Sequence, residues 1–423
     1  MILGGGWTGI IFALELKRAF PSENIIVVEK SNSLGGLLRS RFIKGHLLDI
    51  GGSHVIFSHN KYLLSRILSL LDNNFVKHVR KAYVLLNSIL VPYPFENGLY
   101  VLPPEERAEA LVHFLEAWIS RDEDWRPKTF KDWIYGFFGK WIAEKYLVPY
   151  NVKIWKRSLD DIDSDWVYTP GRLPIPDWRD IVRSAIGIPT IGYVEQSIFY
   201  YPKYGGIQSL FDSAVKEAKK LGIKFLTNIN VSEVKRTHNG WLINGKFRAR
   251  RLVSTIPLKD LIKMLDAPTE IIRASEKLDY NKVAVIGIAL KRAALTQHWI
   301  YVPDDNIAFH RYAWISNYSP KNAPKGQSTM LVEATLSPND RITTEDLTDK
   351  VVTDLERLDV IREKDVIFAR GWIHEYGYPI YRIGHNKIRE QIIQWLDEQG
   401  LSLIHISEPT RPLYISYAVF CLK

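Results

Sequence analysis

The chain has 423 residues, of which 46% are hydrophobic and 24% are charged. These values are ordinary for a globular protein with a core, and they exclude a mainly disordered chain, a collagen-like chain and a small disulfide-stapled fold. The formal net charge of +9 favours anionic partners, but it does not choose among nucleic acid, a membrane surface and a phosphorylated small molecule. The single cysteine excludes an internal disulfide and a structural zinc site built from cysteines.

The start of the chain predicts neither a signal peptide nor a membrane anchor. The first residues, MILGGG, enter a glycine-rich turn at once, and no stretch reaches the ~18 consecutive apolar residues of a spanning helix. Together with the cysteine usage, this predicts a cytoplasmic protein.

Residues 4–9 read GGGWTG, a G-x-G-x-x-G motif formed by Gly4, Gly6 and Gly9. A helical pattern follows, and the β-branched run IIVVEK then ends near Glu29. This order is typical of a βαβ unit that binds a dinucleotide. The glycines let the backbone approach a pyrophosphate at the helix N-terminus, and Glu29 can accept hydrogen bonds from both ribose hydroxyls. The motif alone does not separate FAD from NAD.

Two further glycine pairs follow the acid. Residues 31–41 place Gly35, Gly36 and Arg39 just after it, and the segment HLLDIGGSHVIFSHNKY contains Gly51-Gly52 and His54. The order resembles the flavoprotein family of amine oxidases, protoporphyrinogen oxidases, phytoene desaturases and UDP-galactopyranose mutases. In that family the second glycine pair and nearby basic residues lie along the flavin side of the cofactor, so the resemblance implies FAD. Taken by themselves, the glycine pairs are also compatible with plain turns.

The middle of the chain alternates between helical and strand patterns. Residues 62–147 are largely helical, and Pro103-Pro104 before two glutamates is a typical helix start. Gly205-Gly206 precedes an amphipathic helix, and Asn239-Gly240 and Asn244-Gly245 predict tight turns in a strand meander. Between residues 281 and 336, apolar and polar residues alternate, which indicates strands that face a cavity.

These patterns predict an α/β fold with a Rossmann-like FAD-binding domain, an inserted helical domain and a strand-rich substrate domain. The expected FAD-binding domain is discontinuous and comprises residues 1–62, 203–260 and 365–400. The helical insertion covers residues 63–165, and the strand-rich domain covers residues 166–202 and 261–364. Residues 402–423 lack the glycine-containing ending of the family, so we expect this tail to be foreign to the fold, as a frameshift or an adaptor-derived read-through would be.

Several segments together resemble the UDP-galactopyranose mutase family, closest to its eukaryotic-type form: GGGWTG, GGSHVIFSHNKY, PYNVKIW, YPKYGG, LVSTIPL, WIYVPDDNIAFHR, SNYSP and YGYP. They span residues 1 to about 400. The resemblance implies a flavin-dependent isomerase in which N5 of reduced FAD attacks the anomeric carbon of a UDP-sugar and UDP leaves. The sugar then recloses as the smaller ring without net oxidation. NAD(P)H or another reductant would be needed to activate the flavin.

The resemblance also implies roles for individual residues. Arg311 matches an arginine that holds the UDP diphosphate, Arg172 is the expected second arginine, and His54 matches a histidine beside the flavin, although Ser53 departs from the family's GGH order. The implied substrate-binding residues are Asn151, Trp155, Gln196, Tyr301, Tyr318 and Tyr378. The implied cofactor-binding residues are Gly4, Gly6, Gly9, Glu29, Gly35, Gly36, Arg39, Gly51, Gly52, Gly205 and Gly206. Without the resemblance, the arginines and tyrosines are equally compatible with salt bridges and core packing.

Two other functions compete with the mutase. A flavin oxidase or desaturase acting on an amine, a porphyrinogen or a polyene shares the FAD-binding features, but it needs a mainly apolar cavity. A nucleic-acid or membrane-surface protein is supported only by the net charge, so we expect neither as a partner. The histidines show no paired metal spacing, and we expect no metal site. The sequence does not fix the exact substrate, the reductant or whether the chain forms a homo-oligomer.

Overall fold

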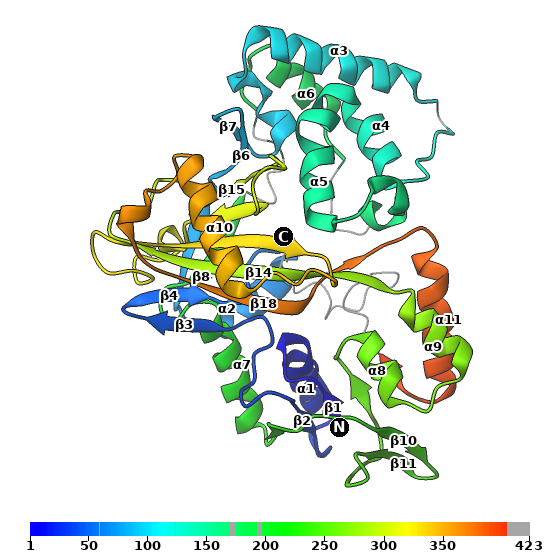
Figure 1. The fold of residues 1–423 in the computed structure, drawn as a ribbon. Helices are drawn as coiled ribbons and strands as arrows, with labels where there is room; N and C mark the ends of the chain where they lie inside the picture. Colours follow the sequence, from blue (N-terminus) through cyan, green and yellow to red (C-terminus); the bar gives the residue numbers. More distant parts are fainter. Residues whose placement is uncertain (59, 123, 169–174, 191, 193–196, 404–423) are drawn as a thin grey trace.

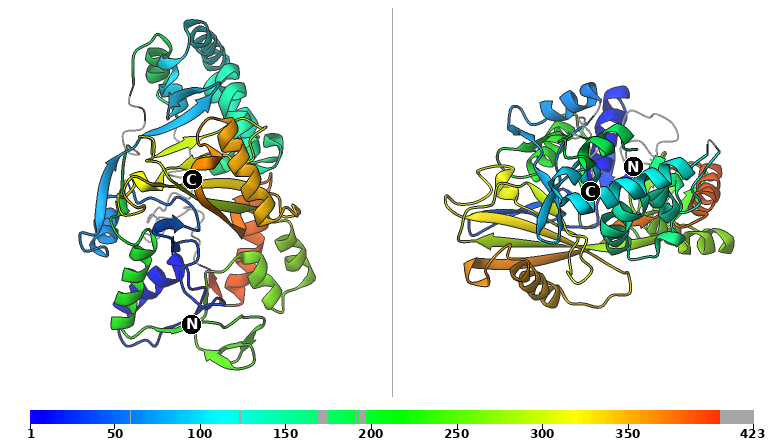
Figure 2. Two further views of the ribbon diagram at one scale, coloured as in Figure 1. Left: turned by 60° about the vertical axis from the view of Figure 1, so that its left-hand side comes forward. Right: turned by 90° about the horizontal axis from the view of Figure 1, so that it is seen from above.

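The computed structural model describes residues 1–58, 60–122, 124–168, 175–190, 192 and 197–403. These residues form three parts stacked along the long direction of the molecule (Figure 1). A nucleotide-binding part contains the N-terminus, a large sheet lies in the middle, and a group of helices lies at the far end. Figure 2 shows from a second direction that the large sheet separates the other two parts.

The nucleotide-binding part is built on a five-stranded parallel sheet. Its strands, in spatial order, are β19 (Ser402–Leu403), β13 (Val253–Ser254), β1 (Ile2–Leu3), β2 (Ile26–Val28) and β9 (Lys224–Leu226). Because side chains alternate along a strand, Ile2 and Val27 belong to one buried cluster, whereas Leu3 and Val28 belong to another. The two faces of this small sheet are therefore both covered, as in a Rossmann-like unit, and this confirms the predicted fold class.

Helices α1 (Trp7–Ala19) and α7 (Gln208–Lys220) pack on the face of Ile2. The opposite face is covered by the predicted meander and by three helices. The meander is the sheet β10 (Val234–Thr237), β11 (Gly240–Ile243) and β12 (Phe247–Ala249), and the helices are α8 (Leu258–Met264), α9 (Thr269–Glu276) and α11 (His385–Glu398). Asn244 and Gly245 both have positive φ between β11 and β12, which confirms the turn expected there.

A seven-stranded sheet forms the middle of the molecule. Its spatial order is β18 (Val366–Ile380), β14 (Asp279–Leu290), β17 (Ser328–Leu336), β16 (Arg311–Ala313), β15 (Trp299–Tyr301), β6 (Ala82–Leu86) and β7 (Ile89–Pro92). All neighbours are antiparallel except β15 and β6. Helix α10 (Thr344–Arg357) covers one face, where Leu347 and Val351 pack with Ile286 and Val332. The residues of the candidate functional site lie on the other face.

The helices at the far end are α3 (Pro104–Ser120), α4 (Phe130–Ile142), α5 (Val148–Trp155) and α6 (Trp178–Ala185). Helix α3 begins at Pro104, as the proline and glutamate pattern predicts. Helix α4 begins with a capping box, in which the Thr129 and Asp132 side chains each accept a hydrogen bond from the other residue's backbone N–H. Helix α2 (Lys61–Ser69) and two antiparallel two-stranded sheets complete the fold. One sheet pairs β3 (Ser40–Ile43) with β4 (His46–Asp49), and the other pairs β5 (Phe75–Val79) with the distant β8 (Ile198–Pro202). None of the described helices is long and apolar enough to cross a membrane.

Several segments differ from the expected organisation. Helix α6 joins the helical group, where Trp178 contacts Trp118 of α3, and α9 covers the nucleotide-binding sheet, although both helices were expected in the strand-rich domain. Residues 75–92 form the strands β5, β6 and β7 instead of continuing the helical block, and β6 completes the large sheet by pairing with β15. Residues 366–380 form β18 of that same sheet, because they pair along almost the whole length of β14, and they do not join the nucleotide-binding part. Ser402 and Leu403 extend the parallel sheet by pairing with β13, so the expectation that the tail is foreign is wrong for these two residues. Residues 404–423 lie outside the described residues.

Candidate active site

The glycine-rich turn sits between β1 and α1. Beside it, the carboxylate of Glu29 accepts hydrogen bonds from the backbone N–H groups of Gly5 and Ser31, both at 2.9 Å. Among the described residues, no side chain caps the N-terminus of α1, and its first turn contains no acidic residue. The N–H groups and the dipole at this helix end therefore favour an anion such as a pyrophosphate.

Gly6 and Gly36 keep the space in front of this helix end free of side chains. A Cβ atom added to Gly6 would meet only the Cα of Gly36, at 3.9 Å, among the described residues. By contrast, a Cβ on Gly9 would lie 2.0 Å from the carbonyl oxygen of Gly4, so Gly9 is needed for packing between helix and strand. These are the separate glycine roles that a dinucleotide-binding turn requires, and the residues present fit a dinucleotide.

Arg39 lies across Gly35, whose added Cβ would come within 2.7 Å of the Arg39 Cγ. Its Nη2 donates to the carbonyl oxygen of Ser33, and its buried Nε has no partner among the described residues. Gly205 and Gly206 lie just before α7, where a Cβ on Gly206 would contact Ser40 and Asp49. A packing role thus explains Gly206, and cofactor contact by these two glycines stays a prediction.

The second glycine region, Gly51 to His54, follows β4. A Cβ on Gly51 would lie 1.9 Å from the carbonyl oxygen of Leu37, so only glycine fits where this loop crosses the first one. The His54 ring lies 3.1 Å from the Gly52 carbonyl oxygen through Nδ1. Because a carbonyl only accepts, Nδ1 carries the proton in the neutral ring, and Nε2 is left as an acceptor.

The large sheet supplies the other side of the site. In the strand register, Tyr301 lies opposite Arg311, and Arg311 lies opposite Glu333. Side chains that are directly opposite share a face, so these residues form one row across β15, β16 and β17 on the face away from α10. Nη2 of Arg311 lies 2.5 Å from Oε2 of Glu333, and both side chains are buried. The Nε of Arg311 has no hydrogen-bond partner among the described residues.

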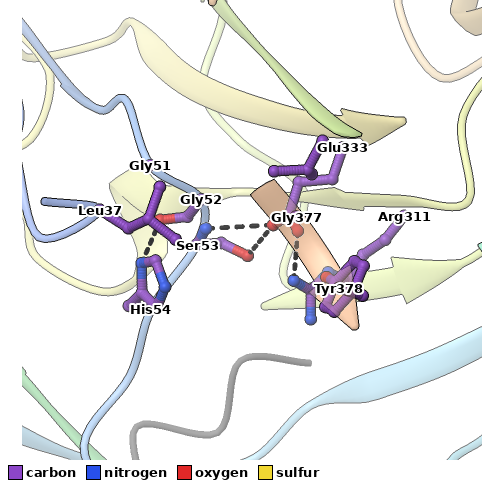
Figure 3. A pocket seen from close by; sticks show the side chains of 10 residues that line it. Leu37, Gly51, Gly52, Ser53, His54, Arg311, Glu333, Gly377 and Tyr378 are labelled. Atoms are coloured by element: carbon purple, nitrogen blue, oxygen red, sulfur yellow. Dashed lines mark hydrogen bonds and ion pairs between the residues drawn. The ribbon is translucent and has the colours of Figure 1, made fainter. Parts of the chain in front are cut away.

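A pocket joins this row to the glycine loops (Figure 3). It is lined by Leu37, Gly51, Gly52, Ser53, His54, Val283, Arg311, Glu333, Gly377 and Tyr378. The loop after β4 and the strands β14, β16, β17 and β18 thus converge on one space. The structure brings together His54, Arg311, Tyr378 and the Gly51-Gly52 pair, all of which were singled out from the sequence.

The pocket contains a charged pair and a neutral histidine. Burial favours the neutral form of Glu333, but Arg311, His310 and the hydrogen bond from Ser53 together lower the pKa of Glu333 to about 2. Burial also disfavours the charge on Arg311, yet the Glu333 carboxylate raises the pKa of that guanidinium above its ordinary value. Burial lowers the pKa of His54 to about 4, so this imidazole is neutral at physiological pH.

The predicted tyrosines differ in their surroundings. Tyr318 is fully buried and packs against Phe199 and Tyr201, and burial raises the pKa of its hydroxyl. Tyr301 is also buried, and its hydroxyl accepts a hydrogen bond from the Trp299 indole at 3.0 Å. Only Tyr378 lines the pocket directly.

The predicted residues of the helical part lie beside the pocket and not in its lining. The Trp155 indole donates to Oδ1 of Asn151 at 3.2 Å, and the Asn151 amide donates to the Leu147 carbonyl. The ring of Trp155 approaches that of Tyr378, with centroids 6.3 Å apart, which connects α5 to the pocket. Arg172 and Gln196 lie outside the described residues, and their roles stay predictions.

Glu333 is a pocket-lining residue that the sequence analysis missed. The strand STMLVEATL carries one acid among apolar and small polar residues, and every residue of this strand is buried. A buried carboxylate requires a partner, so this lone acid was a signal that could have been used.

Comparisons with known proteins agree with this geometry. Residues 178–386 match the family model described as flavin containing amine oxidoreductase, and residues 2–71 match that of an NAD(P)-binding Rossmann-like domain. A stretch of 79 residues is 35% identical to the "Uncharacterized protein in nifH2 3'region" of Methanothermococcus thermolithotrophicus, which corresponds to 19% of this chain and 70% of that protein.

Among solved structures, the chain is similar to reduced UDP-galactopyranose mutase, with a TM-score of 0.85 and 24% identity over 95% of this chain and 86% of that one. It is also similar to a protein from Exiguobacterium sp. 255-15 whose name refers to protoporphyrinogen oxidase, with a TM-score of 0.73 and 18% identity over 96% and 93% of the two chains. At these identities the likeness shows the fold, and it does not decide between the reactions of the two relatives.

Proposed function

We propose that the chain is an FAD-dependent isomerase of the UDP-galactopyranose mutase type. The matches to the flavin containing amine oxidoreductase model and to the Rossmann-like model, together with the similarity in fold, support a flavin-dependent enzyme. The single observation that carries this proposal is the buried Arg311, which lines the same pocket as the Gly51-Gly52 loop and retains an unpartnered Nε among the described residues. A guanidinium in this position suits an anionic leaving group next to a flavin.

Each part of the pocket has a role in the proposed reaction. When bound, reduced flavin would supply a nucleophilic nitrogen for the anomeric carbon of the sugar. Arg311 would hold the diphosphate and favour its departure, because its raised pKa keeps the guanidinium charged. His54, neutral and with a free acceptor at Nε2, would accept a hydrogen bond at the flavin side of the pocket. Tyr301, Tyr318, Tyr378, Asn151, Trp155, Arg172 and Gln196 are proposed to complete the UDP site.

The cofactor would be held by the two glycine regions. Gly4, Gly6 and Gly9 would bind the pyrophosphate at the N-terminus of α1, and Glu29 would bind a ribose through lone pairs that its backbone contacts leave free. Gly35, Gly36, Arg39, Gly51 and Gly52 would follow the cofactor toward the flavin. We propose FAD as the dinucleotide, a UDP-sugar as the substrate and NAD(P)H or another reductant as the activator.

The oxidase reading is retained as a second candidate because residues 178–386 match the flavin containing amine oxidoreductase model. An amine substrate, however, carries positive charge, and a buried guanidinium at the pocket disfavours it. A polyene would need an apolar lining, whereas this lining contains His54, Arg311, Glu333 and Tyr378.

The decisive experiment is incubation of the purified, flavin-loaded protein with UDP-galactofuranose, with and without dithionite. We expect UDP-galactopyranose to form only in the reduced sample, and chromatography of the sugar nucleotides measures it. The Arg311→Lys variant is the matched control, since it keeps the charge but loses the planar donor pair. Oxygen-coupled turnover of an amine or a porphyrinogen, together with no response of the flavin spectrum to UDP, would establish the oxidase instead.

A further inference from the structure

We propose that Glu333 is a positioning residue that couples the flavin-side loop to Arg311 by holding Ser53 with one carboxylate oxygen and the guanidinium with the other. This inference rests on the proposed function in taking Arg311 as the residue that binds the diphosphate. The link to Ser53 requires no substrate and can be tested separately.

The geometry of the link is specific. Oε1 of Glu333 accepts hydrogen bonds from the backbone N–H of Ser53 at 3.0 Å and from its hydroxyl at 2.7 Å. Oε2 accepts from Nη2 of Arg311 at 2.5 Å. Figure 3 shows Glu333 between the two partners, with Ser53 on the loop side and Arg311 on the sheet side. One carboxylate thus joins segments that are 280 residues apart in the chain.

All three members are buried, with exposed fractions of 8% for Ser53, 6% for Arg311 and 3% for Glu333. A buried ion pair is stable only where further hydrogen bonds satisfy the remaining lone pairs, and Ser53 supplies two of them. Ser53 is also the residue by which this loop departs from the GGH order of the family. The Glu333 carboxylate thus accepts hydrogen bonds from the residue that is additional in this loop.

This arrangement makes the position of Arg311 depend on the loop. The guanidinium lies against one oxygen of Glu333, and the orientation of that carboxylate is fixed by Ser53. An anion that binds Arg311 would use the Nε that Glu333 leaves without a partner among the described residues, and a flavin that contacts Gly51 to His54 would act on the other end of the same carboxylate. By thermodynamic linkage, if bound flavin changes the affinity for UDP by some factor, bound UDP must change the affinity for flavin by the same factor.

The test is a double-mutant cycle with Ser53→Ala, Glu333→Gln and the double variant. UDP affinity is measured by calorimetry, and flavin affinity by the recovery of absorbance on adding FAD to stripped protein. We expect Glu333→Gln to weaken UDP binding about tenfold, because it removes a charge-assisted hydrogen bond that orients Arg311. We expect Ser53→Ala to weaken UDP binding about threefold alone and to have almost no effect in the Glu333→Gln background.

Two results would overturn the inference. One is an equal effect of Ser53→Ala in both backgrounds, which would mean that Ser53 acts without Glu333. The other is unchanged or tighter UDP binding in Glu333→Gln, which would mean that Glu333 only neutralises Arg311. The Glu333→Asp variant tests whether the charge alone is sufficient. It keeps the carboxylate, but its side chain is one methylene too short to contact both Ser53 and Arg311. We therefore expect its UDP affinity to resemble that of Glu333→Gln.

Failure of the proposed function gives a different pattern. If the wild-type protein does not bind UDP, the proposed mutase function is wrong. The double-mutant cycle is then evaluated from the flavin affinities alone. The inference still requires Glu333→Gln and Ser53→Ala to weaken flavin binding to a similar extent, without additivity in the double variant. Unchanged flavin affinity in both single variants would refute it. Ser53→Ala retains the ion pair, so it keeps the test valid if Glu333→Gln does not fold.

Discussion

Some residues of this protein are needed for the fold, whereas others are expected to matter only for ligand binding. Gly6 is the clearest example of the second kind. Several glycines near the nucleotide turn are needed because neighbouring atoms crowd them: the carbonyl oxygen of Gly4 crowds Gly9, and the Thr255 side chain crowds Gly4. Gly6 has a φ of −81°, which any residue adopts, and only the Cα of Gly36 lies near its missing Cβ. The absence of a side chain at Gly6 therefore serves a bound group and not the fold.

We predict that Gly6→Ala folds as the wild type does but binds flavin about tenfold more weakly, because the new methyl occupies space that a pyrophosphate needs. Flavin absorbance after gel filtration measures the loss, and thermal unfolding of the flavin-free protein checks the fold. A variant that retains a full complement of flavin would show that the cofactor does not lie against this turn.

At the scale of elements, one lysine fixes helix α5 to the large sheet. The buried amino group of Lys153 donates to the carbonyl oxygens of Val302 and Asp304 at the end of β15, and the Thr335 hydroxyl on β17 donates to the Lys153 carbonyl. Asn151 and Trp155 lie two residues away on either side. The position of these two residues relative to the pocket therefore depends on this contact.

We predict that Lys153→Met lowers the free energy of unfolding by about 1–3 kcal/mol, because the buried Val302 carbonyl loses the amino group as a donor and the Asp304 carbonyl keeps only the Ile307 N–H. UDP affinity should fall as well, since α5 is no longer held against β15. Urea unfolding and calorimetry measure the two effects, and Lys156→Met, at an exposed position just beyond the helix, is the matched control. Normal UDP binding in a destabilised Lys153→Met protein would exclude a positioning role for α5.

For the whole molecule, stability is linked to histidines buried where the parts meet. Burial lowers the pKa of His54 to about 4 and that of His310 to about 3. In the unfolded chain these rings bind protons near the ordinary value, about 6.5, and in the folded protein they do not. The contribution of these neutral histidines to stability is therefore complete above about pH 6.5, and it is lost as the pH falls toward their pKa values in the folded protein.

We predict that the free energy of unfolding falls between about pH 6 and pH 5 by up to ~1.4 kcal/mol per pH unit for each of these histidines. His310→Gln, which stays neutral, should reduce the slope by that amount. Urea titrations across this pH range provide the slopes. Equal slopes for the wild type and His310→Gln would contradict the linkage.

Local patterns allowed much of this molecule to be predicted. The motif of Gly4, Gly6 and Gly9, the start of α3 at Pro104 and the turn at Asn244-Gly245 depend on neighbouring residues, and the structure has each of them as expected. The assignment of β18 and of residues 75–92 was wrong because pairing with distant strands decided it. The alternation of apolar and polar residues in a segment can predict a strand, but it does not predict which distant strands will pair with it and bury it.

The amino-acid order by itself determined which side chains share a face of each strand, since alternation is a property of one strand alone. Only the tertiary structure decided that Tyr301, Arg311 and Glu333 stand in one row, because the register between strands is set by the packing of the whole sheet. The same holds for Ser53, which reaches Glu333 only because the loop after β4 lies against β17. The nucleotide turn is thus a local feature, whereas the charged pocket exists only in the folded chain.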